Sequence, residues 1–440
     1  MRVSLAIERG RVAAVGFDAR GCGTAIAAGS AAVALLEGRA LLDAARIGAD
    51  DVAAALGGLS PAKRHAAELA ADALHRALGA AVRAGARLER APGRTLVALS
   101  GGVDSAVAAH LCGTRAVAVT LELWADAEGD AERSCCSAAA VRAARSLAHG
   151  LGLPHLSVDL RDEFRAGVVE PWLAGHAAAQ TPNPCVRCNG RVRIDAMLEL
   201  AASLGADCLA TGHYARIGGG LLRVARDERK DQSYMLAALA PDALGRLRFP
   251  LGELRKPEVR DLARRAGIPV ADKPDSQDLC FLAGVGRERF LARHGAIGER
   301  PGAVIDLAGQ TLGSHRGANA FTVGQRRGLG IGGGTPLYVL ATDADANTVT
   351  VGPRAALATR TVVLRDAVLH GGGADRVRLR HGQRPVACTL RDEGSDVTLT
   401  LAEPVAGVAP GQLACLMEGD AIVGHGTIAA RRRVARAAAR

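Results

Sequence analysis

The sequence predicts an α/β protein of several domains, with a parallel-sheet domain in the middle, a small α+β module before it and β-rich domains after it. The chain has 440 residues, enough for about three domains of roughly 150 residues each. Between about residues 94 and 267, short apolar runs alternate with helical stretches, which is typical of a parallel sheet with connecting helices. After about residue 284 the apolar runs become short, alternating and interrupted by glycine, which is typical of β structure.

The first two expected domains are residues 1–91 and residues 92–283. The first is Ala-rich and mostly helical in pattern, after two short strand-like runs and a glycine-rich turn at Gly21-Cys22-Gly23. We expect it to form a separate α+β module. In the second, the apolar runs at 96–99, 116–123, 155–160 and 207–211 predict the strands of the parallel sheet.

The C-terminal half is expected to contain a small central β-rich domain, residues 284–358, and a β-barrel, residues 359–430. Strands are expected at 303–306, 338–341 and 348–351, and then at 377–379, 387–390 and 397–401. The last ten residues, 431–440, carry five arginines. Such a basic tail is usually solvated, and contact with phosphates is the alternative.

The composition of the chain limits the classes of function that it can have. The formal net charge of +10 suits a polyanionic partner, although solubility alone would also explain it. With only 11 aromatic residues, a broad base-stacking surface is not expected. No lysine follows a glycine, which excludes the Walker A motif of P-loop kinases and GTPases. Ten unevenly spaced cysteines without an apolar leader favour a reducing cytoplasm, and no apolar run reaches the roughly 18 residues of a membrane span.

The strongest local signal is Ser100-Gly-Gly-Val-Asp-Ser105, which follows a strand-like run and precedes a helical one. At such a turn the free backbone N–H groups and the positive end of the helix point at one spot, and glycines let the backbone approach an anion. The sequence therefore predicts a phosphate site. Asp104 adds a carboxylate that can hold a hydrated Mg²⁺ beside it.

Two cysteine loops follow, around Cys185-Val-Arg-Cys188 and around Cys280. A thiolate can carry a terminal sulfur as a persulfide, and a second thiol can attack the bridging sulfur. Sulfur transfer therefore needs two cysteines that are close in space. The alternatives are half of a zinc site for Cys185 and Cys188, although no second CxxC exists, and an inert buried thiol for Cys280.

The turn resembles the PP-loop of ATP pyrophosphatases, which release pyrophosphate and leave AMP on a substrate oxygen. Together with the cysteine loops, the whole of residues 94–428 resembles the tRNA-specific 2-thiouridylase (MnmA) family. Further matching segments are Ala210-Thr-Gly-His-Tyr214, Lys230-Asp-Gln-Ser-Tyr234, Phe249-Pro-Leu-Gly-Glu253, Lys256-Pro-Glu-Val-Arg260, Phe321-Thr-Val-Gly-Gln-Arg-Arg-Gly-Leu-Gly330 and Pro410-Gly-Gln412.

The resemblance implies the roles of particular residues. Cys188 would be the catalytic nucleophile and Cys280 the persulfide carrier, with a disulfide bond between them during turnover. ATP would be bound by Ala98, Leu99, Ser100, Gly101, Gly102, Val103, Asp104, Ser105, Leu121 and Gly212. The tRNA would contact Asn183, Pro184, Cys185, His213, Lys230, Asp231, Gln232, Arg380, His381 and Gln412. No resident metal is expected beyond Mg²⁺ that arrives with ATP.

The implied activity is a sulfurtransferase reaction on the wobble uridine of tRNA. Sulfur can replace the C2 oxygen only when that oxygen becomes a leaving group, and attachment of AMP achieves this. The base must also leave its stack, and Lys and Arg must meet the tRNA backbone. Two alternatives stay open: adenylation of another tRNA base or a small molecule, and an iron-sulfur or zinc carrier built on Cys22, Cys185 and Cys188.

Two features depart from the family pattern. Some family members have Asp in place of Cys185, so the acid or base of the reaction must be another group or the Cys185 thiol. Cys135 and Cys136 lie where one cysteine is familiar, and we interpret both as structural.

Residues 11–83 resemble the later part of the IscU/NifU-like iron-sulfur scaffold, through Gly21-Cys-Gly-Thr-Ala-Ile-Ala27, Leu35-Leu-Glu-Gly-Arg39 and Pro61-Ala-Lys-Arg-His65. Only Cys22 remains of the expected cysteines, and one thiolate with one histidine is too few for a stable cluster. We therefore expect a docking domain for a cysteine desulfurase, with Cys22 relaying sulfur to Cys280. The sulfur donor is expected to be a cysteine desulfurase or a sulfur-relay protein. A structural remnant is an equally good interpretation.

The chain has only four lysines, Lys63, Lys230, Lys256 and Lys273, and all lie in or beside the matched segments. We hypothesise that a compact ammonium group is required there.

Overall fold

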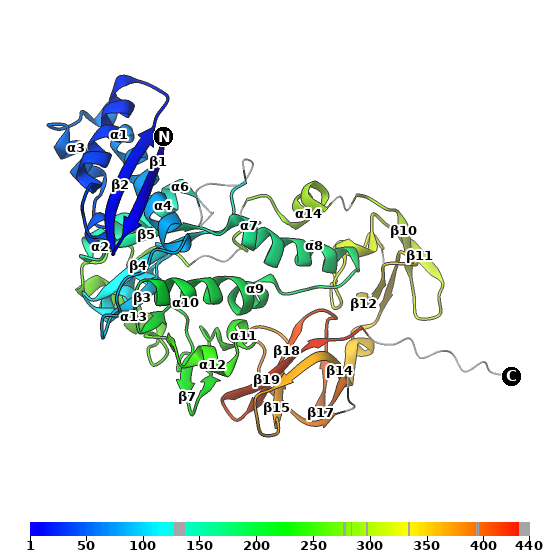
Figure 1. The fold of residues 1–440 in the computed structure, drawn as a ribbon. Coiled ribbons are helices and arrows are strands. Elements are labelled where there is room, and N and C mark those ends of the chain that lie inside the picture. Colours follow the sequence, from blue (N-terminus) through cyan, green and yellow to red (C-terminus); the bar gives the residue numbers. More distant parts are fainter. Residues whose placement is uncertain are drawn as a thin grey trace.

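The computed structural model describes residues 1–126, 137–275, 279–282, 284–295, 298–332, 335–392, 394 and 396–430. Cys135, Cys136 and the basic tail 431–440 lie outside these residues. The predicted fold class is confirmed, because a parallel-sheet α/β domain is preceded by an α+β module and followed by two β-rich domains (Figure 1).

The N-terminal module pairs one hairpin with a group of helices. Strands β1 (Arg2–Glu8) and β2 (Arg11–Asp18) are antiparallel. The helices are α1 (Gly23–Leu36), α2 (Leu41–Ala44), α3 (Ala49–Ala55), the 3₁₀ turn η1 (Pro61–Lys63) and α4 (Arg64–Arg83). Along α4 the buried residues Ala67, Ala70, Leu74 and Leu78 recur every three or four positions, which is the spacing of one helix face.

The central sheet has five parallel strands in the order β5 (His155–Asp159), β4 (Ala116–Glu122), β3 (Thr95–Ala98), β6 (Cys208–Ala210) and β9 (Leu247–Arg248). The first four match the predicted strands. The two-residue β9 was too short to predict. Both faces of the sheet are covered by helices, which explains why its strands are continuous apolar runs rather than alternating ones.

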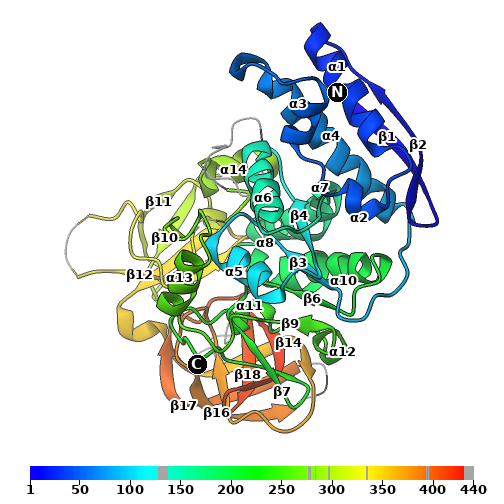
Figure 2. The same ribbon diagram turned by 90° about the vertical axis from the view of Figure 1, so that its left-hand side faces the viewer.

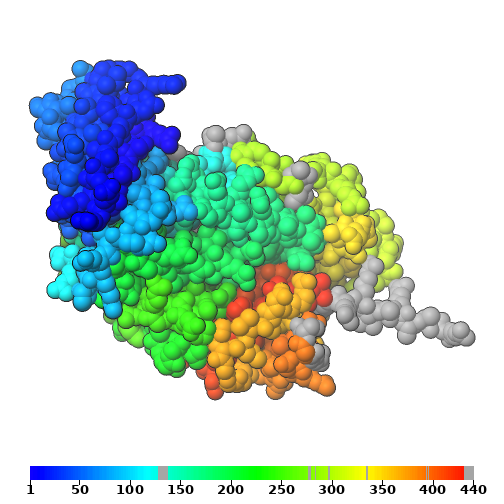
Figure 3. Space-filling model, in the orientation of Figure 1, coloured from blue at the N-terminus to red at the C-terminus, as the bar shows by residue number. Residues whose placement is uncertain are grey.

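Helices α5 (Val103–Cys112), α6 (Ala138–Gly150) and α13 (Lys256–Arg265) lie on one side of β3 and β4, and α10 (Ile194–Ser203) lies on the other (Figure 2). Val97 and Leu99 share a core with the first group. Leu96 and Ala98, on the opposite face, share a core with α10 and with α4 of the N-terminal module. The module and the central domain are therefore packed together, and Figure 3 shows the module resting on the domain.

Further short elements complete the central domain and connect it to the β-rich domains. They are helices α7 (Arg161–Phe164), α8 (Glu170–Ala177), α9 (Pro184–Cys188), α11 (Ser233–Leu236), α12 (Pro241–Leu244) and α14 (Arg287–Gly295), the π-helical turns η2 (Arg165–Val169) and η3 (Asn189–Arg193), and the hairpin of β7 (Arg216–Gly218) and β8 (Leu221–Arg223).

The two β-rich domains follow. The first has the order β11 (Thr311–His315), β10 (Gly302–Ile305), β13 (Thr348–Gly352) and β12 (Tyr338–Asp343), with 3₁₀ turns η4 (Ala318–Ala320) and η5 (Arg354–Leu357). The second consists of β14 (Ala358–Leu369), β15 (Arg376–Arg378), β16 (Val386–Asp392), β17 (Asp396–Ala406), β18 (Leu413–Glu418) and β19 (Ala421–Ile428). Pairing of β14 with β19 closes these strands into the predicted barrel.

The barrel is joined to the central domain, because β8 pairs with β19. In the described part of the chain, no helix has the length and apolar character needed to cross a membrane.

Candidate active site

A cavity of about 650 Å³ lies where β3, β4 and β6 end, which is the edge where α/β sheets bind their ligands. Both predicted cysteine loops and the predicted phosphate turn line it. The residues on its wall include Ala98, Leu99, Ser100, Gly102, Val103, Asp104, Ser105, Leu121, Pro184, Cys185, Cys188, Gly212, His213, Lys230, Asp231, Gln232, Cys280 and His381.

The turn between β3 and α5 is held in shape by its own serines. The backbone N–H of Ser100 donates to Oγ of Ser105 over 3.1 Å, and the Ser105 hydroxyl donates to the carbonyl of Gly102 over 3.0 Å. Gly101 has φ of 73°, a conformation that favours glycine. The turn thereby directs the N-terminus of α5 at the cavity, as an anion site requires.

Gly212, which follows β6, packs directly against this turn. A Cβ atom there would lie 2.8 Å from the carbonyl carbon of Asp104 and from the backbone nitrogen of Ser105. Only glycine fits such a close approach of two backbones. Close packing of two backbone segments therefore explains why this predicted nucleotide contact is a glycine.

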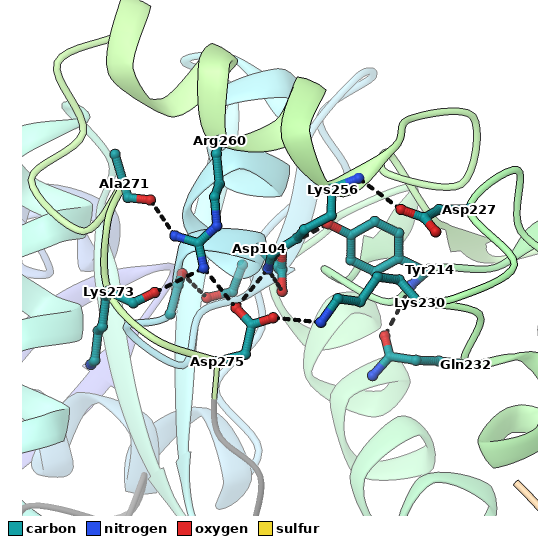
Figure 4. Close-up of polar contacts among 12 residues, drawn as sticks. Asp104, Tyr214, Asp227, Lys230, Gln232, Lys256, Arg260, Ala271, Lys273 and Asp275 are labelled. Atoms are coloured by element: carbon teal, nitrogen blue, oxygen red, sulfur yellow. Dashed lines mark hydrogen bonds and ion pairs between the residues drawn. The ribbon is translucent and has the colours of Figure 1, made fainter. Parts of the chain in front are cut away.

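Asp104, the carboxylate of the turn, is bound by two buried groups (Figure 4). The Tyr214 hydroxyl donates to Oδ1 over 2.9 Å, and Nζ of Lys256 lies 2.7 and 2.8 Å from the two carboxylate oxygens. Burial and the Asp104 charge raise the pKa of Tyr214. Its phenol therefore stays protonated and donates to Asp104.

Asp275 lies on the other side of Lys256 and gathers three cations. Its carboxylate is 2.8 Å from Lys256, 2.7 Å from Lys230 and 3.1 Å from Arg260. Burial alone would raise the pKa of Asp275, but the bonds from the lysines hold it below its usual value. Lys273 donates to the carbonyl of Gly101 over 3.1 Å. Three of the four lysines thus converge on the phosphate turn.

The Cys188 loop is ordered by backbone capping and by the barrel. The Asn183 side chain accepts hydrogen bonds from the N–H groups of Cys185 and Val186, over 3.0 and 3.4 Å, and so caps α9. One step earlier, Thr181 donates its N–H to Pro410 over 3.0 Å, and the Gln412 side chain donates to the Thr181 carbonyl. The barrel therefore fixes the start of the loop at Thr181, and the Asn183 cap fixes the start of helix α9.

The two thiols of this loop differ in exposure. Cys188 is 8% exposed, whereas Cys185 is half-buried. Burial raises the pKa of the Cys185 thiol, and the Arg193 charge lowers it in part. The helix passes directly into the π-helical turn η3, a geometry that is rare and often found at functional sites.

The Cys280 loop is anchored by aromatic packing instead. Phe281 is buried against Trp124, Phe164, Trp172 and Phe290, with ring centroids 5.1 to 6.5 Å apart. Five of the chain's 11 aromatic residues meet in this cluster. Cys280 itself is half-buried, so a rigid apolar base holds an accessible thiol at the cavity.

His213 lines the cavity next to Gly212. Its Nδ1 lies 2.7 Å from the Thr211 hydroxyl, and burial, with a contribution from the Arg193 charge, lowers its pKa to about 3. His213 is therefore neutral at physiological pH and can form hydrogen bonds but carries no charge toward a phosphate.

Four family models match consecutive parts of the chain. They are described as NifU-like N terminal domain (residues 1–83), tRNA methyl transferase HUP domain (93–284), tRNA methyl transferase PRC-barrel domain (288–353) and aminomethyltransferase beta-barrel domain (357–428). The bifunctional protein NifU/MnmA of Rubrobacter xylanophilus is 44% identical over 96% of this chain and 89% of its own. The chain belongs to the MnmA family.

Other MnmA relatives match without the N-terminal part. The tRNA-specific 2-thiouridylases of Thermobifida fusca and Frankia casuarinae are 43% and 45% identical, over 79% and 76% of this chain and 98% of theirs. A solved NAD+ synthetase from Burkholderia pseudomallei aligns with 46% of this chain and 68% of its own, at 20% identity and a TM-score of 0.26. The predictions of the family, of its enzyme class and of nucleotide use are confirmed.

Some predicted tRNA contacts have structural partners here. The Asp231 carboxylate is 3% exposed and forms an ion pair with Arg378 of the barrel over 2.6 Å. The Gln232 side chain accepts from the N–H of Tyr214 over 3.0 Å. Gln412 anchors Thr181, as described above. Within the described residues Gly101, Asn183, Arg380 and Gln412 do not line the cavity. The roles assigned to all these residues stay predictions.

Several features of the site were missed from the sequence. Asp275 was not singled out, and Tyr214 and Lys256 were named only within matched segments or, for Lys256, as one of four lysines. The rarity of lysine was the signal that could have grouped them. Arg193 and the aromatic cluster had no signal, because their members are scattered along the chain and meet only in the fold.

Proposed function

We propose that this chain converts the wobble uridine of tRNA to 2-thiouridine, using ATP and a persulfide sulfur. The observation that supports this most strongly is that one cavity is lined by the phosphate turn and by both cysteine loops. A nucleotide and two thiols can then act on one base without leaving the cavity.

The first step is adenylation. The C2 oxygen of the uridine attacks the α-phosphorus of ATP, the bond to the β-phosphate oxygen breaks, and pyrophosphate leaves. The amides at the start of α5 would stabilise the charge that develops on the phosphates. Lys256, Lys230 and Lys273 add positive charge at the same end of the cavity.

The second step is sulfur transfer. The terminal sulfur of a Cys280 persulfide attacks C2, and AMP leaves with the former C2 oxygen. The Cys188 thiolate then attacks Sγ of Cys280, which releases 2-thiouridine and leaves a Cys188–Cys280 disulfide. An external thiol reductant must reduce this disulfide before the next turnover. The half-buried Cys280 suits a thiol that meets an outside sulfur donor, and the buried Cys188 suits one that acts only inside the cavity.

The cavity fits a Mg²⁺ that arrives with ATP better than a resident ion. Both oxygens of Asp104 already accept bonds from Tyr214 and Lys256, so Asp104 would meet the ion through water. In the described part of the chain, no group of three His, Cys, Asp or Glu residues is placed to hold a metal. Bound Mg²⁺ would neutralise charge on the pyrophosphate group.

A second cavity supports contact with the tRNA backbone. It lies between residues 226–230 and α13 and is lined by seven cationic side chains and three carboxylates. Arg229 and Lys230 line both this cavity and the nucleotide cavity. Binding that uses these residues should weaken steeply with salt, because each phosphate contact releases counterions.

Cys22 is the candidate for sulfur entry. It is exposed at the start of α1, and the hydrogen bond from the Ala25 backbone N–H lowers its pKa, which favours the thiolate. Cys22 is not among the described residues that line the nucleotide cavity. We propose that it receives sulfur from a cysteine desulfurase, and a Cys22→Ala variant tests this. Unchanged thiolation with a desulfurase and cysteine would leave the module without a relay role.

The proposed function is tested by mass spectrometry of nucleosides from tRNA incubated with the protein, ATP, Mg²⁺, a desulfurase and cysteine. Wild type should form 2-thiouridine with AMP and pyrophosphate. Cys280→Ser should form no 2-thiouridine but still release about one pyrophosphate per tRNA. Production of ADP, or thiolation without nucleotide, would contradict the proposal. Metal analysis of anaerobically purified protein tests the alternative of an iron-sulfur or zinc carrier.

A further inference from the structure

The free edge of the central sheet is covered by the N-terminal module. β5 is the edge strand, and such an edge normally exposes unpaired backbone groups. Here the N–H of His155 donates to the carbonyl of Ala45 over 2.9 Å. The His155 carbonyl lies 2.8 Å from Nδ1 of His75, in α4. The first residue of β5 is therefore bonded to the module through both its backbone groups.

Helix α4 continues along the rest of this strand. Three positions four residues apart on the helix meet three carbonyls two residues apart on the strand: His75 meets His155, Gly79 meets Ser157, and Arg83 meets Asp159. Four helical residues advance about 6.0 Å, and two strand residues advance about 6.6 Å. The two spacings match, so α4 runs beside β5 over its whole length.

A charged contact from α4 reaches the wall of the nucleotide cavity. The Arg76 guanidinium donates two hydrogen bonds to Glu122, over 2.7 and 2.8 Å. Glu122 ends β4, its side chain is 5% exposed, and its chain neighbour Leu121 lines the cavity. The hydrogen-bonded ion pair of this buried carboxylate is thus made with an arginine of the module.

A second contact reaches the phosphate turn. Nε2 of His155 lies 2.8 Å from the Thr120 hydroxyl, which itself donates to the carbonyl of Leu99 over 2.7 Å. Leu99 directly precedes Ser100. Since the Thr120 hydroxyl is the donor to Leu99, it accepts from His155, whose ring packs beside the ring of His75 in α4, with centroids 5.5 Å apart.

A third contact reaches α6. Asp72 of α4 forms an ion pair with Arg145 over 2.8 Å, and both side chains are largely buried. The same helix α6 lies behind the turn, because a Cβ atom on Gly101 would be 3.6 Å from the carbonyl of Ala140. The module therefore reaches the Leu121 wall through Arg76, the phosphate turn through His155 and Thr120, and α6 through Asp72.

We infer that the NifU-like module is a fixed structural part of the nucleotide site, in which Arg76 and His75 of α4 position the phosphate turn and the Leu121 wall for ATP. This inference rests on the proposed nucleotide site. It assigns the module a role that does not depend on Cys22, on a cluster or on a sulfur donor.

The test compares two arginines of the same helix in the full chain. Arg76→Ala should raise the KM for ATP about tenfold, which is about 1.4 kcal/mol, and should leave the KM for tRNA and the kcat at saturating ATP within about twofold. Arg64→Ala is the matched control, because Arg64 pairs with Asp50 inside the module. It should leave the KM for ATP unchanged. Arg76→Lys, which keeps the charge, should give an intermediate KM.

Thr120→Val provides a second variant that preserves side-chain volume and removes only the hydroxyl. It should raise the KM for ATP in the same way, and combination with His75→Leu should add little, because His75 packs beside the His155 ring that bonds Thr120. If Arg76→Ala and Thr120→Val lower the melting temperature but keep the wild-type KM for ATP, the module is only a stabilising domain and the inference is wrong. An inactive wild type would instead contradict the proposed function.

Discussion

The two halves of the active-site cavity are built by different physical means. The nucleotide half is a network of charges, in which Asp104 and Asp275 are joined by Lys256 and flanked by Lys230 and Arg260. The sulfur half is an apolar frame, in which Phe281 holds the Cys280 loop in an aromatic cluster. The difference suits the chemistry. Phosphates need fixed positive charge, whereas a persulfide needs exact placement away from competing water.

This contrast implies that damage to one half should spare the reaction of the other. Adenylation should be sensitive to the lysines, and sulfur transfer should be sensitive to the aromatic cluster. Pyrophosphate release and 2-thiouridine formation report the two halves separately.

The largest expected effect is in the sulfur half. Phe281→Ala removes a side chain that is 2% exposed, and truncation of a buried Phe typically lowers the free energy of unfolding by about 3–5 kcal/mol. The neighbouring Cys280 should lose its fixed position, so 2-thiouridine formation should fall far more than the first release of pyrophosphate. Urea unfolding and single-turnover assays measure the two effects.

Phe281→Leu is the control for this variant, because it keeps most of the buried volume. It should retain thiolation. If Phe281→Ala reduces pyrophosphate release as strongly as thiolation, the two halves are not independent and the contrast fails.

In the nucleotide half, Lys256→Arg should lower kcat/KM for ATP about 100-fold, or about 2.7 kcal/mol. The Lys256 side chain is 11% exposed and bonds to two carboxylates, so a longer planar guanidinium cannot take its place. Lys230→Arg should have a smaller effect, because Lys230 is 37% exposed and, among the described residues, forms its ion pair with one carboxylate, Asp275.

The structure narrows the hypothesis of a required ammonium group to Lys230, Lys256 and Lys273. Lys63 is exposed in the N-terminal module, so Lys63→Arg should be tolerated and is the matched control. Equal kinetics of the Lys256→Arg variant and wild type would disprove the hypothesis that the site requires a compact ammonium group.

The interface between α4 and β5 should lose stability at acidic pH. Burial, together with the charge of Arg145 and the neighbouring His149, lowers the pKa of His75 to about 3, and burial also lowers that of His155. A folded pKa below the unfolded value of about 6.5 stabilises the protein above pH 6.5, and this stability is lost as the pH falls toward 3. For His75 the loss between pH 7 and pH 5 is about 2 kcal/mol.

His75→Leu should therefore show a smaller fall in the free energy of unfolding between pH 7 and pH 5 than wild type does. Urea unfolding at the two pH values measures it. An unchanged pH dependence would mean that His75 titrates normally in the folded protein.

Much of the nucleotide half could be predicted from the sequence. The Ser100 to Ser105 turn is a local feature, because strand, glycines and helix are contiguous and their geometry follows from backbone chemistry. The four longer strands of the sheet were predictable from continuous apolar runs. The cysteine loops were found through residue type and resemblance, and the structure places both on the cavity.

The rest depends on contacts between distant segments. The aromatic cluster joins Trp124, Phe164, Trp172, Phe281 and Phe290, and no local pattern relates these positions. β9 has two residues, and β18 and β19 were missed among irregular apolar runs. The match of α4 to the edge of β5 depends on the residue spacings of a helix and a strand that become neighbours only in the folded protein.

The smallest expected effect tests the packing of α4 against β5. The measurement is whether an alanine at Gly79 raises or lowers the stability of the protein. Alanine in place of a helix-interior glycine usually stabilises a helix by about 1 kcal/mol. At Gly79 a Cβ atom would lie 2.0 Å from the Ser157 carbonyl oxygen, so Gly79→Ala must push α4 away from β5 and should destabilise the protein by about 1 kcal/mol. Gly150→Ala is the control, because Gly150 also lies in a helix and its Cβ position is open. It should be neutral or slightly stabilising. If Gly79→Ala also raises the KM for ATP while sulfur transfer from preformed adenylated tRNA is unchanged, the nucleotide half alone depends on the N-terminal module. A stabilised Gly79→Ala protein would show that α4 does not rest against this edge.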